Sequence, residues 1–220
     1  VMDQIPAAET PGTLAASQIK AASELLGRAF EHDPLMLYLV PNARKRARLL
    51  PAFFRIVLRY CWRYGVVYTA PDLTGVACCL PPGQTNPALT RLVQIALRGL
   101  PPRLGLAGLL RFLRVSHYTD QAHAQTAAGA HWYLWVLGVE PQTQGQGNGS
   151  RLLQTLLQQA AAQQVPCYLE TENPRNLPFY QHHGFHLVSD TIVARTSLHV
   201  YALLWEPARP EASPAYASHT

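Results

Sequence analysis

Two segments in the first third of the chain carry apolar residues at helical spacing. Within residues 15–30 and 43–63 apolar side chains recur every three or four positions, which predicts two amphipathic helices interrupted by Asp33-Pro34. Cationic side chains line the other faces of the second helix, and we interpret them as a solvated surface rather than a ligand site. These cations are Arg44, Lys45, Arg46, Arg48, Arg55, Arg59 and Arg63.

The remaining pattern alternates between strands and helices. A hairpin is predicted over 66–69 and 76–80, because Pro71-Asp72-Leu73-Thr74-Gly75 is a turn signal between two apolar runs. Residues 88–125 predict two helical segments, split at residues 99–102, that either cover a substrate cleft or serve packing. Later elements are predicted as strand 132–139, helix 149–163, strand 166–170, helix 176–182, and strands 185–188 and 197–205.

Length and composition predict one globular domain over residues 1–206, followed by a disordered tail over 207–220 that is rich in proline, alanine and serine. Of the 220 residues, 48% are hydrophobic and 14% are charged, with a net charge of +5. This charge suits an anionic ligand, and no nucleic-acid-binding motif accompanies it. The four cysteines lack paired spacing, and no apolar run is long enough to span a bilayer. We therefore predict a cytoplasmic protein with reduced thiols and no membrane or nucleic-acid partner.

The segment from Gln142 to Ser150 is the most informative part of the chain. Three alternating glycines lie between the predicted strand 132–139 and helix 149–163. Glycine lets backbone N–H groups turn toward one point, and the start of a helix adds free N–H groups and positive partial charge. This arrangement predicts a cradle for a phosphate or pyrophosphate group.

The glycine loop alone does not identify the phosphate ligand, and a dinucleotide is one candidate. A dinucleotide site would need the spacing Gly-x-Gly-x-x-Gly, with an acid that ends the next strand, and Glu170 lies near the right distance. The glycines instead alternate strictly, and residues 140–144 separate them from the strand. A nucleotide-binding P-loop is excluded because no Gly-Lys-Ser/Thr follows.

Two ordered motifs resemble the GCN5-related N-acetyltransferase (GNAT) superfamily. Residues 144–149, Gln-Gly-Gln-Gly-Asn-Gly, are similar to its acetyl-CoA loop, Gln/Arg-x-x-Gly-x-Gly/Ala, and the overlapping frame 142–147 matches as well. Residues 176–185, from Asn176 to Phe185, resemble its Asn-x-x-(aromatic or aliphatic)-Tyr-x-x-x-Gly-Phe signature. The resemblance covers residues 132–189. It implies a mixed α/β (α+β) fold with a mostly antiparallel central sheet flanked by helices, and a helical insertion before the cofactor-binding strand.

The resemblance also implies that acetyl-CoA is the co-substrate and assigns residues to it. The loop would hold the pyrophosphate, the strand backbone would bind pantetheine in a gap between two splayed parallel strands, and Asn176 would hydrogen-bond the cofactor. Asn176 could equally cap a helix. The implied cofactor-binding residues are Leu137, Val139, Gln144, Gly145, Gln146, Gly147, Asn148, Gly149, Ser150 and Asn176. In this division, residues 15–125 form the acceptor side and 132–189 the acetyl-CoA core.

Tyr180 matches the general acid of the family, which protonates the departing thiolate. The alternative is that Tyr180, like Phe179, is an aromatic core residue. Strand 132–139 lacks the carboxylate that many family members place there, since Tyr133 and Trp135 occupy that region. The general base is therefore unassigned among candidates that could each be structural instead. These candidates are Glu31, Asp33, His117, His131 and Glu172.

The sequence thus predicts an N-acetyltransferase that transfers acetyl directly to an amine acceptor. The histidines at 182, 183 and 186 lack a completing ligand, so we predict no metal. The alternatives are a non-catalytic acyl-CoA-binding or regulatory protein on the same fold and a dinucleotide-binding oxidoreductase. The acceptor, a small-molecule amine or a peptide or protein amine, and the oligomeric state are left open.

Overall fold

The computed structural model describes residues 11–85 and 105–208, in which seven strands form one sheet in the order β1-β2-β3-β4-β5-β7-β6. Every neighbouring pair of strands is antiparallel except β4 and β5, which are parallel. The predicted mixed, mostly antiparallel sheet is therefore confirmed. The strands are β1 (Gly12–Thr13), β2 (Val66–Thr69), β3 (Gly75–Leu80), β4 (Trp132–Val139), β5 (Cys167–Thr171), β6 (His186–Ile192) and β7 (His199–Trp205).

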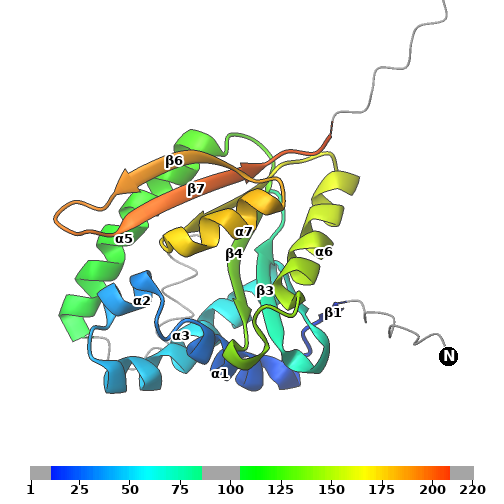
Figure 1. Ribbon diagram of the computed structural model, residues 1–220. Coiled ribbons are helices and arrows are strands. Elements are labelled where there is room, and N and C mark those ends of the chain that lie inside the picture. Colours follow the sequence, from blue (N-terminus) through cyan, green and yellow to red (C-terminus); the bar gives the residue numbers. More distant parts are fainter. Residues whose placement is uncertain (1–10, 86–104, 209–220) are drawn as a thin grey trace, which may run out of the picture.

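Six α-helices in the described residues surround this sheet. They are α1 (Ile19–Ala29), α2 (Pro34–Leu39), α3 (Ala43–Tyr64), α5 (Gly105–Thr126), α6 (Asn148–Ala162) and α7 (Leu177–His182). Figure 1 shows β6 and β7 crossing the top of the view while β3 and β4 run nearly vertically, so the sheet is strongly twisted. The short helix α2 lies below the turn that joins β6 to β7.

Among the described residues, two large hydrophobic cores lie on the two faces of the sheet. One core joins the apolar sides of α1, α2 and α3 to sheet residues such as Val76 and Tyr168, and Ala122 of α5 belongs to it. The other joins α6 and α7 to the opposite face through residues such as Leu152 and Leu169. Alternate residues of each strand point to opposite faces, so the apolar runs of β3 and β4 supply both cores at once. This burial on both faces fixes the strands that border the site.

Most predicted elements match the structure within two or three residues. Strand 132–139 is found with those bounds, and the predicted helices 43–63 and 149–163 correspond to α3 and α6. Of the two helical segments predicted over 88–125, the second corresponds to α5 and the first lies outside the described residues, as do positions 209–220 of the predicted tail. The short strand β1 (Gly12–Thr13) precedes the first predicted helix, and the predicted strand 185–188 extends to Ile192 in β6.

The connection after α1 corrects two expectations. Asp33-Pro34 does interrupt the first helix, but it also starts α2, because Asp33 accepts a hydrogen bond from the Leu35 amide and Pro34 occupies the first helical turn. Arg46 was predicted to be solvated, yet it is 3% exposed. Its guanidinium donates to the carbonyl oxygens of Glu31, Val40 and Pro41 at 2.6, 2.9 and 3.1 Å.

Arg46 therefore holds the chain on either side of α2 against the start of α3. The three carbonyl groups are not part of a sheet or of a long helix, and a buried carbonyl without a partner is costly. A charged donor on the neighbouring helix satisfies them together. As a result α2 lies at a defined position, and so does Asp33, which caps its first turn. Among the residues described, no helix is both long enough and apolar enough to cross a membrane.

Candidate active site

A gap opens between the two parallel strands of the sheet. β4 and β5 pair at Trp132 with Cys167 and at Tyr133 with Tyr168, and the pairing stops there. β4 continues to Val139, held on its other side by β3. The edge of β4 that faces β5 is thus open from Leu134 onward. An extended ligand chain can hydrogen-bond to such an edge in the way an added strand does.

The glycine loop lies at the open end of β4. Gly145 and Gly147 have φ angles of 79° and 82°, in the left-handed region that residues with a Cβ rarely adopt. The first backbone bond of α6 runs from the Arg151 amide to the Gly147 carbonyl at 3.0 Å, so the helix begins with Asn148. The amides from Asn148 to Ser150 then precede the first bond of the helix and can meet an anion. Gly149 lies inside the helix, where an added Cβ would be 3.6 Å from both Phe179 Cζ and Val139 Cγ2.

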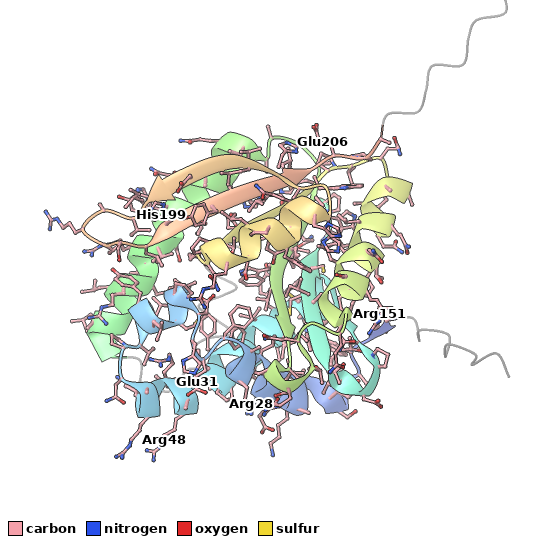
Figure 2. The ribbon with its side chains drawn as sticks, in the orientation of Figure 1. Arg28, Glu31, Arg48, Arg151, His199 and Glu206 are labelled. Atoms are coloured by element: carbon pink, nitrogen blue, oxygen red, sulfur yellow. The ribbon has the colours of Figure 1, made fainter. Side chains whose placement is uncertain are left out.

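Arg151 adds a positive charge to this loop, which the sequence analysis did not anticipate. Its Nη2 donates to Asn148 Oδ1 at 2.6 Å and approaches the Gln146 carbonyl at 3.4 Å. Its Nε is buried and has no hydrogen-bond partner within the described residues. Figure 2 places Arg151 at the start of α6 beside the loop. A phosphate oxygen would suit this unpaired donor, so the residues present fit a pyrophosphate.

The base of the loop is tied to both β4 and α1. Gln144 Nε2 donates to the Val139 carbonyl at 3.3 Å. At the next position, Glu140 forms an ion pair with Arg28, with Nη2 and Oε2 2.6 Å apart. Gly138 lets α1 approach β4 closely, because a Cβ there would lie 2.6 Å from Leu26 Cδ2. The loop therefore starts from a fixed point, although Val139, one of the predicted pantetheine contacts, already accepts a hydrogen bond.

Asn176 lies just before α7 and does not act as a helix cap. Its side chain makes no capping hydrogen bond to α7. Instead Nδ2 donates to Thr171 Oγ1 at 3.1 Å, at the end of β5. The nearby capping role belongs to Asn173, whose Oδ1 accepts from the Arg175 amide at 3.1 Å. The Asn176 amide is thus oriented by β5 at the border of the gap, where its predicted role as a ligand contact remains a prediction.

Tyr180 is buried in α7 and is 7% exposed. Its ring packs against Phe179 and Phe185, with centroids 5.2 and 5.8 Å apart, so it contributes to the core on this face. Burial raises the pKa of its hydroxyl, and the charges of Asp33 and Glu172 raise it further. The hydroxyl therefore keeps its proton at neutral pH, which a general acid requires. Packing and acid catalysis are compatible roles for this residue.

Three carboxyl groups gather on the acceptor side of the gap. Burial is the largest cause of the raised pKa values of Asp33, Glu170 and Glu172, which are about 6, 7 and 8. The charges of Asp33 and Glu170 add to the rise at Glu172, and the hydroxyls of Tyr133 and Tyr168 oppose the rise at Glu170. Carboxyl groups with pKa values near 7 are suited to accept protons at neutral pH.

Glu170 is the member of this group that sequence reasoning placed in another role, as a possible dinucleotide contact. Side chains alternate along a strand, so Tyr168 and Glu170 share the face of β5 that meets α1, α2 and α3. That alternation was visible in the sequence. The burial that raises its pKa was not, because it depends on tertiary packing. Tyr133 and Trp135 fill the same region of β4 as expected, stacked with their ring centroids 6.5 Å apart.

The remaining candidate bases lie elsewhere or are engaged. His117 is exposed on α5, and Glu31 is half-buried before α2. His131 is buried beside His123, with their Nε2 atoms 2.7 Å apart, and its Nδ1 lies 2.9 Å from the Gly129 carbonyl. Since Nδ1 must donate to that carbonyl, neutral His131 accepts from His123 through Nε2. This pair is a satisfied structural contact. Within residues 11–85 and 105–208, no group of three or more His, Cys, Asp or Glu side chains is arranged to hold a metal ion.

Comparisons with known proteins agree with this geometry. The sequence model of the acetyltransferase (GNAT) family matches residues 103–185. An uncharacterised N-acetyltransferase of Schizosaccharomyces pombe is 26% identical over 176 residues, which cover 77% of this chain and 71% of that protein.

Solved structures of acetyltransferases share the fold. One from Corynebacterium glutamicum, described as histone acetyltransferase HPA2 and related acetyltransferase, has a TM-score of 0.64 at 21% identity, covering 93% of this chain and 100% of that one. A polyamine N-acetyltransferase of Drosophila melanogaster has a TM-score of 0.59 at 13% identity, covering 90% and 99%. A mosquito protein described as arylalkylamine N-acetyltransferase like 5b has a TM-score of 0.57 at 13% identity, also covering 90% and 99%. The splayed strands, the glycine loop and α7 thus occur within an acetyltransferase fold.

Proposed function

We propose that this chain, which matches the sequence model of the acetyltransferase (GNAT) family and shares the fold of solved acetyltransferases, transfers acetyl from acetyl-CoA directly to the amine of an acceptor. The observation that carries this proposal is the open edge of β4, which begins where pairing with β5 stops at Tyr133 and ends at the glycine loop. The backbone groups of β4 that are unpaired with β5 thus lie between the glycine loop and the paired start of the two strands. The antiparallel neighbours of β4 and β5 do not form the doubly wound sheet of a dinucleotide-binding oxidoreductase.

The donor would be held in three parts. The loop amides, the dipole of α6 and Arg151 would bind the pyrophosphate. The open edge of β4 at Leu137 and at the amide of Val139 would pair with pantetheine and polarise the thioester carbonyl. Asn176 would contact the cofactor from the other side of the gap. The residues assigned to the loop are Gln144, Gly145, Gln146, Gly147, Asn148, Gly149 and Ser150.

Two side chains would manage the protons. Glu172 accepts a proton from the acceptor ammonium, and the neutral amine nitrogen attacks the thioester carbon. As the carbon–sulfur bond breaks, Tyr180 donates its hydroxyl proton to the departing thiolate, and the phenolate recovers a proton from the newly formed amide nitrogen. Glu172 then releases its proton to solvent, so the net products are an amide, a free thiol and one proton. Each proton transfer of this kind contributes roughly 10²–10⁴-fold to a rate.

Calorimetric titration with acetyl-CoA and NAD in parallel tests the donor assignment. We expect acetyl-CoA to bind and NAD not to bind at the same concentrations. Preferential binding of NAD would overturn the proposal. A release assay for CoA with a panel of amines separates catalysis from binding, because a purely regulatory acyl-CoA-binding protein would bind the donor without thiol release.

A further inference from the structure

A cleft of about 470 Å³ lies beside the carboxyl cluster, within the usual size range of small-molecule sites. It is formed where α2, the end of β5 and the turn between β6 and β7 meet. Figure 2 places His199, one of its lining residues, on β7 and far from Arg151 at the glycine loop. The lining residues are Pro34, Leu37, Tyr38, Glu172, Pro174, Thr196, Ser197, Leu198, His199 and Tyr201.

The walls of this cleft are largely apolar and aromatic. His199 and Tyr201 stack with their ring centroids 5.3 Å apart and an interplanar angle of 10°, which gives one wall a flat aromatic surface. His199 Nδ1 lies 2.7 Å from Asp190 Oδ1, so the Asp190 carboxylate is already engaged. The turn between β6 and β7 is packed on α5 and α2 through a small cluster that includes Leu198 and Tyr38. The cleft is therefore built into the fold rather than formed by a loose loop.

Charge is distributed unevenly along the cleft. Glu172 supplies the single carboxylate among the lining residues that the structure describes, and Asp33, next to the lining residue Pro34, adds negative potential there. At Tyr38, on the α2 side of the cleft, the neighbouring charges are positive. Arg111 lies 5.7 Å from the centre of the Tyr38 ring and donates to its carbonyl oxygen at 3.2 Å, and Arg114 Nη1 lies 3.4 Å from its hydroxyl.

We propose that this cleft binds the acceptor of the acetyl transfer, and that the acceptor is a primary monoamine with an aromatic or branched apolar tail. This inference rests on the proposed function and names the substrate class of the same site. The ammonium group lies against Glu172, next to Tyr180, and the tail lies between α2 and the stacked rings of β7. Burial of such a tail supplies binding energy of about 25 cal/mol per Å² of apolar surface.

A polyamine fits this cleft less well. Its second ammonium would have to leave water for an apolar wall without a carboxylate partner, which costs free energy. It would also approach Arg111 and Arg114, whose positive charges repel it. The charges and the apolar walls of the cleft therefore disfavour an acceptor with a second ammonium group and favour one with an apolar tail.

The test compares kcat/KM for 2-phenylethylamine and 1,4-diaminobutane with the full-length protein and acetyl-CoA. We expect the monoamine to be preferred by at least about tenfold, which corresponds to about 1.4 kcal/mol. The variant Leu37→Glu places a second carboxylate on the α2 wall. Because Leu37 is 40% exposed, the variant should fold. It should shift the ratio of the two kcat/KM values toward the diamine by about tenfold.

Leu187→Glu is the matched control, since Leu187 is 42% exposed and is not among the residues lining the cleft. We expect its ratio to stay within about twofold of the wild-type value. A wild-type preference for the diamine, or an equal response in the two variants, would overturn the acceptor assignment while leaving acetyl transfer intact. Failure of acetyl-CoA to bind in calorimetry would instead overturn the proposed function itself, and the acceptor assignment with it.

Discussion

The Nη2 atom of Arg151 lies 2.6 Å from Asn148 Oδ1, which fixes the guanidinium against the glycine loop. Asn148 is buried and begins α6, so it is held by the helix and cannot easily follow a displaced partner. The remaining donors of the guanidinium include a buried Nε without a partner in the described residues. An arginine oriented in this way meets a pyrophosphate without first losing side-chain freedom.

Replacement of Arg151 by Gln should weaken acetyl-CoA binding about 10- to 100-fold, because a charge-assisted hydrogen bond is worth roughly 1.5–3 kcal/mol. Calorimetry measures the change in Kd. Arg59→Gln is the control, since Arg59 is an exposed arginine on α3, and its Kd should match the wild type. Equal Kd values for all three proteins would remove Arg151 from the donor site.

Replacement of Tyr180 by Phe should lower kcat by about 100-fold while the Kd for acetyl-CoA changes less than about twofold. The ring keeps its packing against Phe179 and Phe185, so the loss is confined to the proton donor. Thiol release at saturating amine measures kcat, and thermal unfolding checks that the fold is retained. An unchanged kcat would show that Tyr180 is a core residue only.

The pH dependence of kcat should report Glu172. Its pKa is raised to about 8, mainly by burial, so the carboxylate that accepts the proton forms only as pH rises through that value. We expect kcat to increase from pH 6, to reach half of its maximum near pH 8 and to level off above about pH 9. Glu172→Gln should abolish this rise of kcat with pH and lower kcat by about 100-fold.

Glu31→Gln is the control for this experiment, because Glu31 is a half-buried glutamate near α2 that we do not assign to the proton transfer. Its profile should follow the wild type. If kcat of Glu172→Gln still rises with pH near pH 8, the proton acceptor is another group. Glu170, whose pKa is about 7, is then the next candidate to test.

The His123–His131 pair should make the fold sensitive to acid. Burial, together with the neighbouring His131, lowers the pKa of His123 to about 4. A depressed pKa means that the folded state resists protonation, so the stabilisation is present above the unfolded pKa of about 6.5 and is lost as pH falls toward 4. Between pH 7 and 5, His123 should cost the wild type about 1–2 kcal/mol in free energy of unfolding.

Urea unfolding of wild type and His123→Gln at both pH values measures this loss. Comparing the two proteins cancels the opposite contribution of the buried carboxyl groups, which favour the folded state at low pH because their pKa values are raised. The variant should lose less stability than the wild type between pH 7 and 5. An identical loss in both proteins would mean that His123 titrates normally.

The donor side of the molecule was largely predictable from the sequence. β4 is an apolar run of strand length, and α6 carries apolar residues at helical spacing. The glycine loop between them marks where the strand ends and where the helix begins. The mostly antiparallel sheet was predicted from the resemblance of two motifs within residues 132–189. The periodicity of the chain did not predict the direction of the strands. These features depend on neighbours in the sequence, and they were found with small errors.

The acceptor side was less predictable, because its features depend on contacts between distant segments. α2 has too few residues to show a helical period, and its Asp-Pro start is also a turn signal. The sequence pattern did not distinguish Arg46 from its solvated neighbours on α3, because its partners are backbone carbonyl groups near α2. The raised pKa values of Glu170 and Glu172 arise from burial, which no local pattern reports.

The most direct measurement is the fate of a labelled acetyl group. The protein is mixed with acetyl-CoA carrying ¹³C in its acetyl carbonyl and with 2-phenylethylamine, and the products are followed by NMR. We expect one equivalent of labelled N-acetyl amide for each equivalent of free CoA thiol, and no labelled acetate above the rate without enzyme. Labelled acetate in place of the amide, or no loss of acetyl-CoA with any amine of the panel, would contradict the assignment as an N-acetyltransferase.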